Sequence, residues 1–187
     1  MKKQSASSSV SIADSSVFRL AWPIFVQALL AMLLGYADTL MLSGYDQKAV
    51  GAIGNASQIL GFLTLAFTVI SSASGVVVAQ YLGAGKKDRI SQIYTLCVAF
   101  NLVLSLVISL IVFFGSDALL ALLHTPHEMM DDARSYMRIV GGFIFVQAVL
   151  DTLSRIFQSN GKTVFGMIIS LGMNVINVWG NYLFLYG

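Results

Sequence analysis

Five long tracts that are almost free of charged residues divide this chain of 187 residues, and they constrain its fold more than any other feature. Only two ionisable side chains, Asp38 and Asp151, lie inside them. Crossing the roughly 30 Å hydrocarbon core of a bilayer takes about 20 predominantly apolar residues in a helix. Four tracts are long enough, and the fourth in sequence, which is short, is extended by apolar residues at both ends. The tracts span residues 20–45, 49–85, 90–116, 139–154 and 163–187.

The overall composition excludes a water-soluble globular domain. Hydrophobic residues make up 57% of the chain and charged residues only 11%, whereas a soluble domain carries about 25% charged residues. The formal net charge of +2 is too small to indicate a nucleic-acid partner. The single cysteine, Cys97, lies in an apolar run, so no intrachain disulfide is expected. The lipid bilayer is therefore the expected surrounding of this chain.

The tracts are expected to be helices. Backbone groups find no hydrogen-bond partners in hydrocarbon, so only helices or closed barrels span a bilayer. Barrel strands are about 10 residues long and alternate strictly, and the run at residues 101–114 does not alternate. The prediction is an all-α membrane protein with a polar tail at residues 1–15 and a transmembrane domain at 16–187. Its five helices are expected at about residues 18–43, 50–81, 90–114, 135–158 and 163–185.

The distribution of lysine and arginine predicts the orientation. Cytoplasmic loops carry an excess of these residues. With the N-terminus inside, eight of the 11 basic residues fall on the inner side and three on the outer side. We therefore expect a multi-pass protein of the plasma or inner membrane with a cytoplasmic N-terminal tail. The outer three are Lys48, Arg134 and Arg138.

Asp38 is the more informative of the two intramembrane carboxylates. Gln27, Ala31 and Gly35 share its helix face, which gives a narrow stripe of small or polar residues. Such a stripe lets a neighbouring backbone come close or lines a water-filled cavity. Ionisable groups inside membranes usually face the bundle interior and carry function. The alternative is that Asp38 is an interfacial residue near the outer boundary.

A second polar stripe runs along the last tract. Ser170, Asn174, Asn177 and Asn181 are spaced four, three and four residues apart, so all four face the same way. Asparagine and serine also form hydrogen bonds between membrane helices, so a purely structural role is the alternative. Three asparagines on one face, with oxygens suited to a hard cation or a proton relay, favour a site.

Asp151 has Arg155 four residues later, a spacing that favours an ion pair on one helix face. We expect a structural pair near the cytoplasmic end. His124 and His127 flank Pro126 in an outer loop without further ligands, so no metal site is predicted. The sequence also contains neither a nucleotide-binding loop nor a nucleophile triad, which argues against an enzyme.

Several short motifs, in their order along the chain, resemble the N-terminal lobe of the multidrug and toxic compound extrusion (MATE) family. The resemblance covers nearly the whole chain after Ser15. No single motif is decisive, but the order of the set is fairly specific. The motifs are AWPI at 21–24, YADT at 36–39, AVGAIG at 49–54, QYLGAGKK at 80–87 and NVIN at 174–177, with the last helix running on to residue 187.

The resemblance implies a fold of twelve helices in two lobes of six, of which this chain is a partial six-helix lobe. It implies an antiporter that exports cationic drugs in exchange for H⁺ or Na⁺, with no bound cofactor. Asp38 matches the carboxylate that binds the coupling ion, and Asn177 and Asn181 match positions that complete that site. Some members have aspartate where Asn181 stands, so a full sodium site is in doubt. Pro23 matches a proline linked to bending of the first helix.

The expected partners are the bilayer, a small cationic substrate and a C-terminal lobe that is absent from this chain. Two other functions remain open at this point. One is a membrane fragment that acts as a scaffold or does not transport. The other is a lipid-linked oligosaccharide flippase of the same superfamily, which would share the architecture and differ in substrate.

Overall fold

The computed structural model contains helices and short turns, and no strand, in the two backbone ranges that it describes. These are residues 4–43 and 47–186. Side chains are described for residues 17–36, 40, 51, 53–86, 88–176, 178 and 179. The all-α prediction is confirmed.

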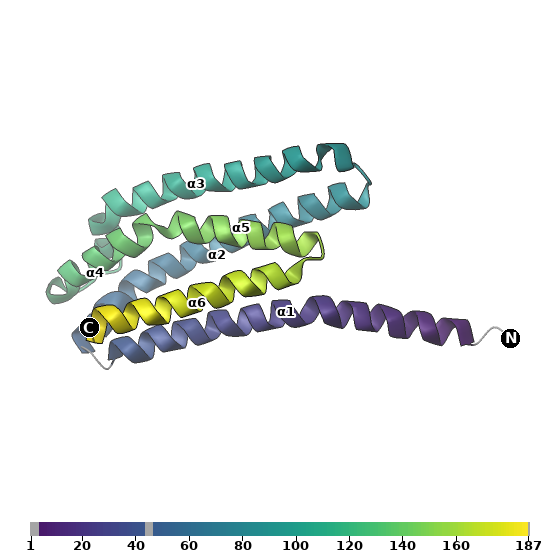
Figure 1. Ribbon diagram of the computed structural model, residues 1–187. Helices are drawn as coiled ribbons and strands as arrows, with labels where there is room; N and C mark the ends of the chain where they lie inside the picture. Colours follow the sequence, from purple (N-terminus) through teal and green to yellow (C-terminus); the bar gives the residue numbers. More distant parts are fainter. Residues whose placement is uncertain (1–3, 44–46, 187) are drawn as a thin grey trace.

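Long helices make up most of the structure (Figure 1). Four stretches of the described residues are long and apolar enough to cross a bilayer, and a fifth, shorter apolar stretch lies in the last helix. That last helix has 24 residues, or about 36 Å of helix. The elements are α1 (Gln4–Ser43), α2 (Gln47–Gly83), α3 (Lys87–Leu122), η1 (His127–Met129), α4 (Met130–Tyr136), η2 (Met137–Gly141), α5 (Ile144–Ser159) and α6 (Thr163–Tyr186).

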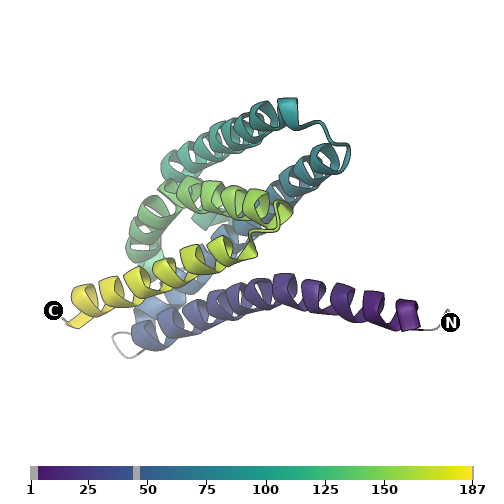
Figure 2. The same cartoon turned by 45° about the vertical axis from the view of Figure 1, so that its right-hand side comes forward.

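The helices form two groups that meet along α5. α2, α3 and α5 pack on one another, and α1 lies alongside α6 (Figures 1 and 2). Phe67, Val112 and Ala148 belong to one buried cluster that holds the first group together. α1 and α6 run in the same direction, since both end on the same side of the molecule in both views. This parallel pairing determines which residues of the two predicted stripes lie at the same level.

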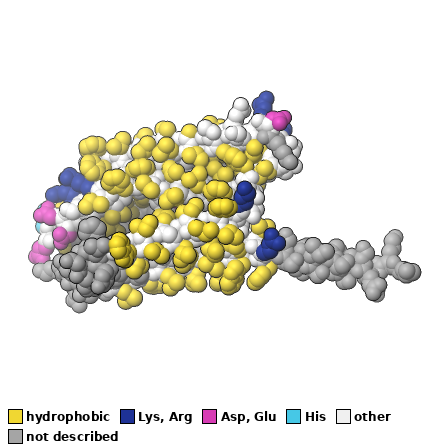
Figure 3. Space-filling model, in the orientation of Figure 1, with side chains coloured by type: hydrophobic (Ala, Val, Ile, Leu, Met, Phe, Trp, Pro, Cys, Tyr) yellow, Lys and Arg dark blue, Asp and Glu magenta, His cyan; other side chains and the backbone are white. Residues whose placement is uncertain are grey.

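The exterior of the bundle is strongly apolar (Figure 3). Phe114 and Ile176, for example, are 76% and 74% exposed. Monomeric soluble proteins rarely expose large contiguous apolar surface. In Figure 3 the hydrophobic side chains cover the middle of the molecule, while lysine, arginine and acidic side chains stand at its two ends. This distribution is the one that a lipid-embedded bundle requires.

The helix bounds differ from the prediction at three places. α1 already begins at Gln4, so the polar tail continues the first helix. α3 continues to Leu122, eight residues beyond the predicted end. The fourth predicted helix is interrupted, because a π-helical segment, Met137–Gly141, separates α4 from α5. The glycine at its end faces α3 closely: a Cβ atom on Gly141 would lie 2.5 Å from Val112 Cγ1.

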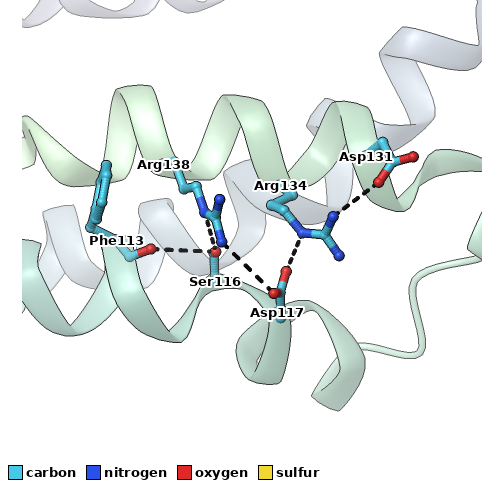
Figure 4. Close-up of polar contacts among 6 residues, drawn as sticks. All are labelled: Phe113, Ser116, Asp117, Asp131, Arg134 and Arg138. Carbon is cyan, nitrogen blue, oxygen red and sulfur yellow. Dashed lines mark hydrogen bonds and ion pairs between the residues drawn. The ribbon is translucent and has the colours of Figure 1, made fainter.

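Ion pairs join the polar end of α3 to the segment that follows it (Figure 4). The carboxylate of Asp117 accepts a hydrogen bond from Arg134 Nε and lies 3.8 Å from Arg138 Nη2. Arg138 Nε also donates to Ser116 Oγ over 3.2 Å, and Arg134 Nη1 lies 3.0 Å from the carboxylate of Asp131. The last turns of α3 are therefore tied to α4 and η2 at the polar end of the bundle.

Candidate functional site

The two helices of the predicted site, α1 and α6, meet α5 at a polar junction. Gln158 Nε2 on α5 donates to Gln27 Oε1 on α1 over 3.0 Å. On α6, Gly166 faces the same oxygen, and a Cβ atom there would lie 2.8 Å from it. A larger residue at 166 would force the Gln27 side chain to move. Glycine thus permits the close approach of α6 to α1, as small residues do in membrane bundles.

The predicted stripe on α6 is described only in part. Ser170 and Asn174 are both partly buried. Asn174 Nδ2 donates to the backbone oxygen of Ser170 over 2.8 Å, which is a bond within the helix. The side chains of Asn177 and Asn181 lie outside the described residues. Their role as ligands stays a prediction.

The predicted stripe on α1 is also described in part. Gln27 is partly buried and contacts α5, whereas Gly35 is exposed. Pro23 is buried inside the helix, and Figures 1 and 2 both show α1 as an arched helix. Proline removes one backbone hydrogen bond, which is a known cause of helix bending. The side chain of Asp38 lies outside the described residues.

The predicted ion pair between Asp151 and Arg155 is not present. Among the described residues, no basic nitrogen lies within 4.0 Å of the Asp151 carboxylate. Asp151 Oδ1 instead accepts a hydrogen bond of 3.2 Å from Gln147 Nε2. Arg155 Nη1 donates to Gln158 Oε1 over 3.3 Å. Gln158, one turn beyond Arg155, thus takes the place of Asp151 as the partner of the guanidinium. Residue spacing alone does not predict which of the two accepts.

A buried hydroxyl and amide cluster joins α2, α3 and α5, and sequence reasoning missed it. Asn101 Nδ2 donates to Ser71 Oγ over 3.2 Å and to Thr152 Oγ1 over 2.6 Å. The two hydroxyls are 3.1 Å apart. All three side chains are fully buried. Such bonds tie membrane helices together. Asn101 stands in the middle of the apolar tract at residues 90–116, and this position could have indicated a hydrogen bond between helices.

One groove of about 610 Å³ has none of the described residues of the predicted site in its lining. It runs between α3 and α5 and is mostly apolar, with Leu102, Leu153 and Phe157 in its wall and Lys162 at one end. Leu153 and Asp151 are two residues apart on α5, which places them on roughly opposite faces of the helix. The groove therefore lies on the face of α5 opposite to Asp151.

Comparison with known proteins agrees with this architecture. The MatE family model matches residues 23–183. The chain is 37% identical over 172 residues to YisQ of Bacillus subtilis, described as an uncharacterized transporter. It is 23% identical over 176 residues to a probable multidrug resistance protein, NorM, of Thermotoga maritima. It is 26% identical over 172 residues to the multidrug resistance protein MdtK of Pectobacterium atrosepticum.

These alignments cover most of this chain but a minor part of each relative. They include 90–92% of this chain and 37–38% of the three relatives. The chain thus spans well under half the length of the proteins that it matches. The family model nevertheless covers nearly all of the apolar helices, from Pro23 in α1 to residue 183 in α6. The resemblance inferred from the sequence is confirmed: this chain belongs to the MatE family.

Proposed function

We propose that this chain forms part of a secondary antiporter that exports cationic drugs or other xenobiotics in exchange for H⁺ or Na⁺. Relatives described as multidrug resistance proteins support the substrate class. The proposed location is the plasma membrane, with the N-terminus in the cytoplasm, as the distribution of basic residues predicts. The transport cycle requires the remainder of a full-length protein.

The observation that carries the proposal is the register of α1 against α6. Gln27 Oε1 and Gly166 fix one level at which the two helices touch. Eleven residues further along each helix stand Asp38 and Asn177. Because the helices run in the same direction, both steps rise by about 16.5 Å at 1.5 Å per residue. Asp38 and Asn177 are therefore expected at the same level.

The same step also preserves the facing direction of both stripes. Eleven residues correspond to about three helical turns, so a residue 11 positions on returns close to the original face. Gln27 faces α6 and Gly166 faces α1, so Asp38 and Asn177 are expected to face each other. Asn181 follows on the same face, one turn beyond Asn177. A carboxylate and two amide oxygens are suitable ligands for a hard cation.

The chemistry of such a site accounts for exchange. One carboxylate on α1 can hold a proton, a sodium ion or the positive group of a substrate. Binding of one then lowers the affinity for the others, and this coupling is reciprocal. The amide at Asn181, where some members have aspartate, leaves the site with a single carboxylate. Both H⁺ and Na⁺ fit such a site as the coupling ion.

The test is Asp38→Asn in the full-length protein, reconstituted in vesicles with imposed H⁺ or Na⁺ gradients. Loss of gradient-driven efflux at normal membrane expression is the expected result, because the amide cannot carry the exchanged charge. Asp88→Asn, which changes an exposed carboxylate at the start of α3, is the matched control. Efflux by Asp38→Asn at the parental rate under both gradients would place the coupling site elsewhere.

A further inference from the structure

Asp151 is the intramembrane carboxylate that the proposed Asp38 site does not use. On α5 it lies between Gln147 and Gln158, and at 100° per residue these three side chains fall within about 40° of one another. Gln158 defines the direction of this face, because it donates to Gln27 on α1 and lies beside Gly166 on α6. Asp151 therefore belongs to the side of α5 that faces α1 and α6.

Two neighbours partly offset the charge of Asp151: Gln147 donates a hydrogen bond, and the guanidinium of Arg155 attracts the carboxylate from beyond ion-pair distance. Among the described side chains, one hydrogen bond, from Gln147 Nε2, reaches its carboxylate, which offers about four acceptor positions. The nearest basic side chain on the helix, Arg155, donates to Gln158 instead. Among the described residues no basic nitrogen approaches within 4.0 Å. A partly buried carboxylate in this setting attracts a cation from outside the chain.

The height of Asp151 along the bundle axis can be compared with that of the proposed ion-coupling site at Asp38. Asp151 precedes Gln158 by seven residues on α5, which runs opposite to α1 and α6 (Figure 1). Seven residues amount to about 10.5 Å along the axis. Gln158 and Gln27 lie at the same level, and in a regular α1 residue 38 lies about 16.5 Å further along. Asp151 is therefore about 6 Å, or one turn, short of the level expected for residue 38.

We propose that Asp151, held by Gln147, is a second anionic contact for the positive group of an organic cation, distinct from the ion-coupling carboxylate Asp38. The inference rests on the proposed antiport function. With two carboxylates, the substrate cation contacts Asp151 while Asp38 exchanges its ion. Asp151 then determines affinity for cationic substrates, and Asp38 determines coupling to the ion gradient. Arg155, one turn away, competes with the substrate for the same negative charge.

The experiment uses the full-length protein in nanodiscs, with tetraphenylphosphonium as the probe of equilibrium binding. Asp151→Asn should weaken binding by about tenfold or more, as expected for loss of one member of a desolvated charge pair. Asp151→Glu should retain most of the affinity. Arg155→Gln should bind the probe several-fold more tightly, because a competing positive charge is gone. The control is Asp132→Asn, an exposed carboxylate on α4, which should leave binding unchanged.

The variants separate this role from a structural one. If Asp151 only stabilised α5, Arg155→Gln would not tighten binding and Asp151→Glu would not preserve it. Parental affinity in Asp151→Asn would overturn the inference, and loss of gradient-driven efflux in Asp38→Asn would still support the antiporter. If the parent neither binds nor exports organic cations, both proposals fail.

Discussion

The contact between Gly141 and α3 gives a prediction whose magnitude follows from the packing. A Cβ atom at residue 141 would lie 2.5 Å from Val112 Cγ1 and 3.1 Å from Leu60 Cδ2. Carbon atoms pack best at about 3.5–4.0 Å. Gly141→Ala therefore requires a shift of about 1 Å in a buried region. Overpacking of this kind typically costs about 1–3 kcal/mol.

The matched control is Gly115→Ala, because residue 115 lies in α3 with no atom within 4 Å of its would-be Cβ. Both substitutions raise helix propensity by up to about 1 kcal/mol. The difference between their free energies of unfolding therefore measures the contact of residue 141 with Val112 and Leu60. We expect Gly141→Ala to be less stable than Gly115→Ala by about 1–3 kcal/mol in unfolding of the chain in mixed micelles.

The clash should depend on Val112, because its Cγ1 atom is the nearest neighbour. In a Val112→Ala background, Gly141→Ala should cost less, because only the contact with Leu60 Cδ2 at 3.1 Å then remains tight, and a double-mutant cycle measures the difference directly. Equal stability of Gly141→Ala and Gly115→Ala would refute the close packing of η2 on α3.

Three further predictions concern the polar junction, the ion preference and the topology. Gly166→Val should displace Gln27 from Gln158 and thereby lower gradient-driven efflux. Gly172→Val is the control, because a Cβ atom at residue 172 would meet open space. Efflux unchanged by Gly166→Val would argue against the polar junction. Asn181→Asp should shift the ion preference of efflux towards Na⁺, because hard cations favour an added anionic oxygen, and an unchanged ratio of Na⁺-driven to H⁺-driven rates would count against the site. A reporter active only outside the cytoplasm should be active after Asp46 or Asp131 and silent after Lys87 or Lys162, and the reverse pattern would overturn the predicted orientation.

The sequence predicted the helices well because the bilayer imposes one simple requirement on them. A tract without charges has to be long and helical to cross hydrocarbon, and α2 and α6 follow such tracts closely. The rule fails where a single charge stands within an apolar helix. Asp117 ends the uncharged tract, but the residues after it are apolar and α3 continues to Leu122.

Side-chain partners were harder to predict than helices, because a polar side chain often has several possible hydrogen-bond partners at similar distances. The four-residue spacing of Asp151 and Arg155 is compatible with an ion pair, yet Arg155 donates to Gln158. Likewise, the break at η2 depends on how Gly141 meets Val112, a contact between segments far apart in sequence. Periodicity describes one helix at a time, and these features arise between helices.

Gly166 illustrates how one such contact between helices sets the geometry of the proposed site. The residue carries no chemistry, but its missing side chain leaves room for Gln27 Oε1, to which Gln158 donates. That contact fixes α1 and α6 in register and brings α5 to the same level. In the proposed site, regular helices with this register would bring residues 38 and 177 to the same level, with Asp151 about one turn short of it. The proposed level of Asp151 relative to residue 38 therefore depends on a glycine about 10–16 Å away along the helix axes.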